Sequence, residues 1–368
     1  MAEVPEPEPK LTQQDIDEAL AAVMEEYSAA AVSVATIELG KVSQSGAWGW
    51  AVKNQQEMTP DTKVRVASIS KVVIAMCAMV MAEEGLVDLD APLNTYWGEG
   101  AVNPYSQGQP SVRTLMTHTS SLKDFEITRR LSKLEGILNS SSSWRDMEPG
   151  DGGYWYYSNF GMCILGTTLE LAADQMLDEY FQSHFCQPMG ITASFHGGNL
   201  PEEELATIYE SGSVGFSAAA QANESVPDAI GMGASYFPGG LTISAVDLAK
   251  LVSILANHGT YQDQQYLSAE SVHQMETPLF SVDPVESSIF QQCLILRRQE
   301  DILGQDVLCY HTGSAYGVYA LMSFNPETGN GVVVLTTGAP YSTDEYGLYS
   351  LCSDLSEKLY NRMEDTTI

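Results

Sequence analysis

The sequence predicts an α+β protein in which one antiparallel sheet, flanked by N- and C-terminal helices, carries an inserted all-helical domain. Alternating β-rich patterns fill residues 30–52 and return near the C-terminus, while the middle of the chain is mostly helical in pattern. Strands from the two ends then form one sheet, and the middle becomes an insertion. We assign residues 11–65 and 245–368 to a sheet domain and residues 66–244 to the helical domain.

The N-terminal part predicts a tail, one helix and a strand pair. The opening MAEVPEPEPK alternates Pro and Glu, so we expect residues 1–10 to form an extended, solvated, disordered tail. LTQQDIDEALAAVMEEY, residues 11–27, has helical spacing, with Thr12 placed to cap it. AAVSVATIELG and KVSQSGAWGWAV then alternate as strands, with Gly40 at the turn between them.

The middle of the chain predicts buried helices and a long loop. The run from Val72 to Ala82 is apolar all round, which predicts a buried helix, and Gly85 is placed to end it. Residues 197–240 are rich in Gly, Ser, Ala and Glu with weak periodicity, which predicts a wandering loop. Three further helices are predicted from the sequences SVRTLMTH, NFGMCILGTTLELAAD and SAVDLAKLVSILANHG.

The C-terminal part predicts four strands and a closing helix. The strands are SIFQQCLILRR, DVLCYHTG, GVYALMSFNP and NGVVVLTTG, and the helix is TDEYGLYSLCSDLSEKLYNRM. Cys293 and Cys309 flank a hairpin-like stretch and are interpreted either as a disulfide between adjacent strands or as two separate buried thiols. No Cys-x-x-Cys and no Cys–His ligand spacing occurs, so we predict no metal site and no cofactor.

Composition limits the partners and the location. The net charge of −31, from 17 basic and 48 acidic residues, disfavours nucleic acid and anionic lipid and favours a soluble monomer. The longest apolar run, Val72 to Ala82, is shorter than the roughly 20 residues that cross a bilayer. The Pro-Glu opening suits a stalk after a removed signal or lipid anchor, or an engineered start with an added Met. Both lead us to expect an extracytoplasmic protein.

The first motif, Ser68-Ile69-Ser70-Lys71, places a hydroxyl and an amine on one helix face at the start of the buried helix. Burial lowers the pKa of a lysine and lets it accept a proton, and the N–H groups of the first helical turn favour developing negative charge. This arrangement is typical of an activated serine nucleophile. A rival pair, Ser120 and Lys123, lies in a polar turn, and we interpret it as chance.

Two further motifs gain meaning from the first. Tyr157-Ser158-Asn159 offers a phenol that relays a proton and a carboxamide that holds a lysine and a substrate amide. His311-Thr312-Gly313 ends a strand, where the glycine allows a substrate backbone to lie close to the strand edge. The N–H groups of Ser314 and Ser68 then form the two halves of an oxyanion hole. Taken singly, these motifs are better explained as an aromatic loop that packs on a helix and as a turn between strands.

The three motifs in this order resemble the penicillin-recognising serine hydrolases, specifically the class C β-lactamase and D-alanyl-D-alanine carboxypeptidase family. Blocks such as EEGLVDLDAPLNTYW, PSVRTLMTHTSSL and PGGLTISAVDLAKLV extend the likeness over most of the chain. The resemblance implies a β-lactamase/transpeptidase-like fold with the active site between the two domains. It implies that Ser68 is acylated, that Lys71 and Tyr157 jointly move its proton, and that Asn159 orients Lys71 and contacts the substrate.

One departure limits the function that the resemblance implies. Classical β-lactamases of this class carry lysine where this chain has His311, and a mostly neutral histidine attracts a substrate carboxylate less strongly. The histidine form is similar to D-aminopeptidases, other peptidases and esterases. His118 lies in a family block and is interpreted as structural, and Ser121 replaces a usual glycine without clear consequence. We therefore expect a serine hydrolase of D-amino-acid peptides or esters, with weak β-lactamase activity left open.

An alternative from another functional class is a penicillin or peptidoglycan sensor that binds covalently without turnover. The intact motifs favour an enzyme over the sensor. An inert structural domain is disfavoured, because a lysine buried without a role costs several kcal/mol. The sequence does not identify the substrate.

Overall fold

The computed structural model describes residues 9–210, 212–284 and 288–364. Its centre is a nine-stranded antiparallel sheet in the order β10-β11-β12-β13-β14-β15-β1-β2-β3. The strands are β1 (Ala31–Glu38), β2 (Lys41–Val52), β3 (Gln56–Glu57), β10 (Phe280–Val282), β11 (Phe290–Gln292), β12 (Arg297–Ile302), β13 (Gln305–Ala315), β14 (Val318–Phe324) and β15 (Gly331–Thr337). β1 pairs with β15 from Ala31↔Thr337 to Ile37↔Gly331, so both ends of the chain build one sheet, as predicted.

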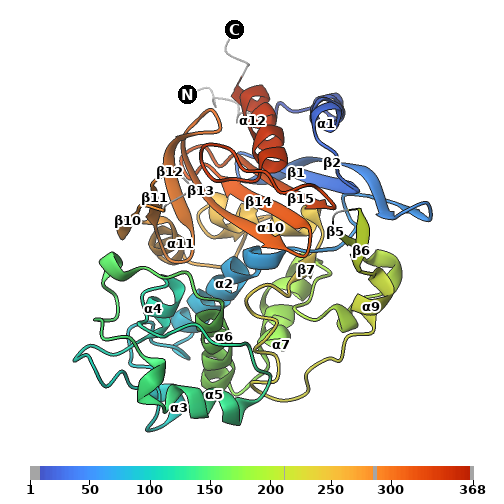
Figure 1. Ribbon diagram of the computed structural model, residues 1–368. Coiled ribbons are helices and arrows are strands. Elements are labelled where there is room, and N and C mark those ends of the chain that lie inside the picture. Colours follow the sequence, from blue (N-terminus) through green and yellow to red (C-terminus); the bar gives the residue numbers. More distant parts are fainter. Residues whose placement is uncertain (1–8, 211, 285–287, 365–368) are drawn as a thin grey trace.

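Three helices cover the sheet (Figure 1): α1 (Gln13–Glu26), α10 (Ala245–Ala256) and α12 (Ser350–Glu364). α1 and α12 lie against one face, where Val32 and Val34 of β1 join their apolar cluster. Ala31 and Ala35, which alternate with them, belong to the cluster that includes α10. β1 is therefore buried along its whole length on both faces, including its polar residues Ser33 and Thr36.

The N-terminal elements form where the sequence predicts them. Thr12 Oγ1 accepts a hydrogen bond from Asp15 N at 3.3 Å, and the Asp15 carboxylate accepts one from Thr12 N at 2.9 Å. This capping box starts α1. Gly40 has φ 74° at the turn between β1 and β2, a conformation that glycine adopts without strain. Most of the predicted tail lies outside the described residues, and Lys10 N already donates to Glu38 Oε1 at 2.6 Å.

The helical part lies on the opposite side of α10 from α1 and α12 (Figure 1). Its helices are α2 (Ser70–Glu83), α3 (Asn94–Trp97), α4 (Val112–Met116), α5 (Leu131–Leu138), α6 (Asn159–Ala173), α7 (Leu177–Phe181), α8 (Gln187–Met189) and α9 (Ala218–Ala222), and α11 (Ala269–Glu276) lies nearer the sheet. α2 is buried from Ser70 to Met81. Gly85 N bonds to Ala82 O at 3.1 Å and Leu86 N to Met81 O at 2.9 Å, which is the glycine-ended stop that the sequence predicts.

The chain enters and leaves the helical part at one place, because β4 (Val64–Arg65) pairs with β7 (Thr242–Ile243). The division into domains stays a prediction. One segment of the assigned insertion contacts the central sheet. β5 (Ile208–Glu210) and β6 (Ser213–Phe216) form a hairpin, and Tyr209 N donates to Thr337 Oγ1 of the sheet at 2.7 Å. The predicted loop 197–240 therefore contains short elements, whose brief apolar stretches show little periodicity.

One predicted strand was wrong in its extent. SIFQQCLILRR forms β11 and β12 with a tight turn between them, where Cys293 N bonds to Leu296 O at 2.9 Å and Ile295 has φ 65°. The turn carries no Gly or Pro, so its apolar residues read as a continuous strand. Cys293 and Cys309 are separate buried thiols, which decides between the two alternatives left open.

β8 (Thr260–Tyr261) and β9 (Gln264–Gln265) form a separate two-stranded sheet. None of the helices in the described residues has the length and apolar character needed to cross a bilayer. Within the same residues, no three His, Cys, Asp or Glu side chains come together as ligands for a metal ion.

Candidate active site

Ser68 and Lys71 meet at the start of α2. The short helix η1 (Ala67–Ile69) runs directly into α2, and Lys71 Nζ lies 2.8 Å from Ser68 Oγ. The spacing of three residues places both groups on one face, as predicted. Ala67, immediately before Ser68, has φ 49°, a left-handed conformation that a non-glycine residue adopts at a cost of about 1–2 kcal/mol. Such strain is concentrated at functional sites.

A backbone carbonyl from a distant loop holds Lys71 in place. Lys71 Nζ donates to Pro238 O at 2.7 Å. The loop is fixed by Ser70, whose Oγ accepts from Leu241 N at 3.0 Å and donates to Ala67 O at 2.6 Å. The second serine of the first motif thus positions the carbonyl that orients the lysine. Sequence reasoning missed Pro238, although it lies in the quoted block PGGLTISAVDLAKLV.

The surroundings of Lys71 favour its neutral form. The side chain is fully buried, and this burial lowers the pKa of Lys71 below its ordinary 10.5. The Tyr157 phenol acts on that pKa in the opposite direction, and the charge of Arg297 lowers it further. A neutral amine 2.8 Å from a hydroxyl can accept its proton. Ser68 itself is half-buried and lines a cleft, so a substrate can reach it.

Tyr157 lies beside Lys71 and belongs to the segment just before α6. Its ring centre lies 4.9 Å from Lys71 Nζ, so the structure brings the phenol and the amine together. The ring of buried His118 lies against it, with centres 4.6 Å apart. His118 Nδ1 accepts from Ser158 N at 3.4 Å, and His118 O accepts from Tyr156 N at 3.0 Å. These contacts match the interpretation of His118 as structural, because it positions the segment that carries Tyr157.

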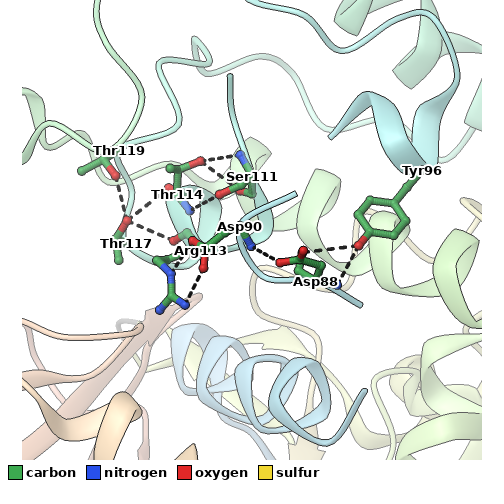
Figure 2. A network of polar contacts seen from close by, with 8 residues as sticks. All are labelled: Asp88, Asp90, Tyr96, Ser111, Arg113, Thr114, Thr117 and Thr119. Carbon is green, nitrogen blue, oxygen red and sulfur yellow. Dashed lines mark hydrogen bonds and ion pairs between the residues drawn. The ribbon is translucent and has the colours of Figure 1, made fainter. Parts of the chain in front are cut away.

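Figure 2 shows a polar network around α4, in the chain segment that leads into His118. Ser111 and Thr114 form a capping box at the start of α4, and Arg113 makes two hydrogen bonds to the Asp90 carboxylate at 2.7 and 2.9 Å. The network ends at Thr117 and Thr119, on either side of His118. Thr117 Oγ1 donates to Arg113 O at 3.1 Å and lies 2.7 Å from Thr119 Oγ1. The turn that carries His118 is therefore held rigidly, which suits a residue with φ 59°.

Asn159 is the first residue of α6 and lines the cleft beside Ser68. Among the described contacts, Lys71 Nζ bonds to Ser68 and Pro238 and not to the Asn159 carboxamide. The orienting role expected of Asn159 is therefore filled by the Pro238 carbonyl in this structure. Contact of Asn159 with a substrate amide stays a prediction.

The third motif lies on β13, where its glycine allows the strand to approach the segment that precedes Ser68. A Cβ on Gly313 would lie 2.2 Å from Val66 O. The approach of a substrate backbone to the strand edge stays a prediction. The close approach brings Ser314 and Ser68 to the same cleft, where both lining residues have N–H groups available for the predicted oxyanion hole. Thr312 and Ser314 pair only with β14, because the β12 pairing ends at Arg297↔Tyr310.

His311 is buried and neutral, and the positive charge of Arg297 acts on it. Burial lowers the pKa of His311 well below 6.5, and the charges of Arg297 and Lys71 lower it further. Arg297 on β12 has its guanidinium 4.6 Å from the Phe290 ring centre. Sequence reasoning missed Arg297. The signal was the β12–β13 hairpin, whose register places Arg297 opposite Tyr310, next to His311.

Ser121 and Lys123 follow His118 closely in the chain, and each makes a hydrogen bond away from Ser68. Ser121, where the family block usually has glycine, has φ 63°, so the usual glycine fits a left-handed position. Its hydroxyl accepts from Asn103 Nδ2 at 2.8 Å, which stabilises the serine there. Lys123 of the rival motif donates to Ser142 O at 2.7 Å at the surface, as expected for a chance match.

Comparisons with known proteins identify the same fold. A family model described as Beta-lactamase matches residues 16–350. The D-amino acid amidase from Ochrobactrum anthropi superposes with a TM-score of 0.72 at 20% identity, covering 96% of this chain and 100% of that chain. The beta-lactamase/D-alanine carboxypeptidase from Pseudomonas syringae gives 0.69 at 19% identity, covering 96% and 99%.

Curated relatives match part of their length. A D-aminopeptidase from Brucella anthropi is 27% identical over 179 residues, which are 46% of this chain and 33% of that protein. Beta-lactamase-like protein 2 from Dictyostelium discoideum is 28% identical over 39% of this chain and 28% of its own length. This chain thus spans about a third of these relatives. Since the family model matches most of the chain, the chain belongs to the beta-lactamase family, and Ser68, Asn159 and Ser314 line one cleft.

Proposed function

We propose that this protein is a serine hydrolase that cleaves amide bonds through a covalent acyl-enzyme on Ser68. The observation that carries the proposal is the buried Lys71 amine 2.8 Å from Ser68 Oγ. Lys71 and Tyr157 together take the hydroxyl proton as Ser68 Oγ attacks the carbonyl carbon. The N–H groups of Ser68 and Ser314 stabilise the oxyanion. The C–N bond then breaks, the leaving amine receives the proton, and water releases the acid and restores Ser68.

The charge of Arg297 favours substrates with a carboxylate beside the bond that is cleaved. It lies one strand from His311 and takes the place of the cation that the histidine does not provide. Guanidinium groups bind carboxylates through paired hydrogen bonds. The names of the similar proteins, a D-aminopeptidase and a D-alanine carboxypeptidase, support D-amino-acid amides as the substrate class. We propose peptides that end in a D-amino acid with a free carboxylate.

The proposal is tested by intact-mass analysis with a fluorescent penicillin, followed by D-alanine release from acetyl-D-alanyl-D-alanine. We expect one adduct on the wild type, located by peptide mapping to the segment containing Ser68, and none on Ser68→Ala. Loss of the adduct within minutes, together with release of D-alanine, identifies a hydrolase. A persistent adduct without release identifies the non-turnover sensor instead, and no adduct with no release contradicts both.

Arg297→Ala is expected to reduce kcat/KM for acetyl-D-alanyl-D-alanine by about 10–100-fold, the range of a charge-assisted hydrogen bond. The C-terminal amide of the same peptide has no carboxylate, so its rate should change much less. The measurement is the ratio of the two rates. Arg298→Ala removes the same charge from the next residue, which bonds to Glu276 O instead, and should keep the wild-type ratio. An equal loss for acid and amide would exclude carboxylate recognition by Arg297.

A further inference from the structure

The cleft continues beyond Ser68 into an end that the proposed reaction does not use. The whole cleft has a volume of about 640 Å³. Away from Ser68 it is lined by Phe216, Tyr236 and three charged residues, namely Arg65, Arg129 and Glu224. Arg297, which is proposed above to bind the substrate carboxylate, is not among the described residues that line the cleft. On that proposal, this end is left for the part of the substrate on the other side of the cleaved bond, the acyl part.

The single carboxylate among these described lining residues is already neutralised. Glu224 forms an ion pair with Arg65 Nη2, and the two side chains are only 14% and 10% exposed. The Arg65 guanidinium also lies 5.1 Å from the centre of the Phe216 ring. Two opposite charges held this closely, with little water around them, present almost no net charge to a ligand. The ion pair forms part of the wall of the cleft. Arg129 is then the lining residue that gives this end of the cleft a net positive charge.

Arg129 is held in place without a carboxylate partner among the described residues. Its Nε donates to Ser235 Oγ at 2.7 Å, and its guanidinium lies 4.5 Å from the centre of the Tyr236 ring. These two contacts fix the plane of the group and leave its terminal nitrogens to face a ligand. The ring of His196 packs edge-on against Tyr236 with centres 4.5 Å apart. Burial, followed by the charges of Arg129 and Arg65, lowers the pKa of His196 to about 4, so this support is neutral.

Arg129 places a positive charge at the cleft of a strongly acidic protein. The chain carries a net charge of −31, so a cation at its surface has many carboxylates available as partners. Arg129 instead lies at the cleft, stacked on an aromatic ring. The acidic protein repels an anionic ligand at long range, and only a local cation can offset that repulsion. A substrate amine at the same place would meet a like charge.

We propose that Arg129, supported by Tyr236, binds a carboxylate on the acyl part of the substrate. This inference rests on the proposed function and narrows its substrate class to N-acylated peptides with an acidic acyl group. A guanidinium with two free terminal nitrogens receives both oxygens of a carboxylate. The same charge disfavours peptides with a free amine near the cleaved bond, which is the substrate type that the name D-aminopeptidase describes for the Brucella anthropi relative.

The test compares three substrates of matched size that differ in one charge: succinyl-, butyryl- and β-alanyl-D-alanyl-D-alanine. Their acyl groups end in a carboxylate, a methyl and an ammonium group. From released D-alanine, we expect kcat/KM for the succinyl compound to exceed that for the butyryl compound by about tenfold, a modest value because Arg129 is exposed. The β-alanyl compound should be the slowest. Added NaCl should reduce the preference, since exposed charges are screened.

Arg129→Ala should abolish the preference and Arg129→Glu should reverse it toward the β-alanyl compound. Arg130→Ala removes an identical charge one residue away, at the exposed start of α5, and should keep the wild-type ratio. A ratio measured on one preparation is independent of the fraction of folded protein. Equal rates for the succinyl and butyryl compounds, or an unchanged ratio in Arg129→Ala, would overturn the subsite and leave the proposed function intact.

If none of the three compounds releases D-alanine, the proposed function has failed and the subsite is judged by binding. Calorimetry with the Ser68→Ala protein then compares the succinyl and butyryl compounds directly. Tighter binding of the succinyl compound that disappears in Ser68→Ala combined with Arg129→Ala supports the subsite. Equal binding of the two compounds contradicts it.

Discussion

Replacing Lys71 by methionine is expected to lower kcat/KM by about 10²–10⁴-fold, the contribution of a positioned general base. Methionine has a similar shape and no proton to exchange. The lysine has no carboxylate partner in the described site, since its Nζ bonds to a hydroxyl and a carbonyl. Removing a buried amine also removes its desolvation cost. We therefore expect the Tm of Lys71→Met to equal or exceed that of the wild type while turnover collapses.

The pH dependence of the wild type gives a second readout of Lys71. Because burial lowers its pKa below 10.5, kcat/KM should rise with pH as the amine loses its proton and level off above that lowered pKa. Between the folded and unfolded pKa values the unfolded chain binds one more proton, so the free energy of unfolding also rises with pH across this window. Lys71→Met should lose that part of the rise.

Lys123→Met is the matched control, because it removes the lysine of the second Ser-x-x-Lys match. Lys123 Nζ bonds to Ser142 O at the surface, so its loss should change turnover little and leave the pH profile unchanged. The general-base role is contradicted if Lys71→Met keeps turnover near the wild-type value. A large loss of Tm together with retained turnover would instead assign Lys71 a structural role.

The sequence predicted the parts of the site that depend on local geometry. Ser68 and Lys71 meet because a helix places residues three apart on one face, and this follows from spacing alone. Pro238 holds Lys71 from 167 residues away, and no pattern in the chain indicates that contact. Arg297 lies between these cases, because the hairpin was recognised but its register was not used. Tyr157 was placed beside Lys71 by resemblance and not by spacing.

The fold was predicted where periodicity is strong and was missed where it is weak. α1, α2 and the β1–β2 pair have clear apolar patterns and end at residues that stop them, such as Gly40 and Gly85. The turn at Ile295 has φ 65° without a glycine, so the sequence contains no turn residue that separates β11 from β12. The contact between Gly313 and Val66 O was not predicted, because a sequence does not reveal which backbone approaches a glycine.

Gly313→Ala is expected to reduce kcat by about 10²–10³-fold, the loss that follows removal of an oxyanion-hole donor. The added methyl would lie 2.2 Å from Val66 O, a backbone atom that cannot rotate away. β13 or the segment before Ser68 must therefore shift, which separates the N–H groups of Ser314 and Ser68. We also expect a loss of about 1–3 kcal/mol in the free energy of unfolding from overpacking. Denaturant unfolding and single-turnover acylation by a fluorescent penicillin measure the two effects.

Gly136→Ala separates the steric effect from the general effect of replacing glycine. A Cβ on Gly136 meets no atom within 4 Å, and the residue lies on the exposed face of α5, so this variant should gain roughly 0.5–1 kcal/mol and keep full turnover. If Gly313→Ala acylates at the wild-type rate, the contact between Gly313 and Val66 does not set the oxyanion geometry. If acylation slows while the Lys71-dependent pH profile persists, the nucleophile and its base are intact. The defect then lies in the stabilisation of the oxyanion, because Gly313 is the point where β13 contacts the segment that precedes Ser68.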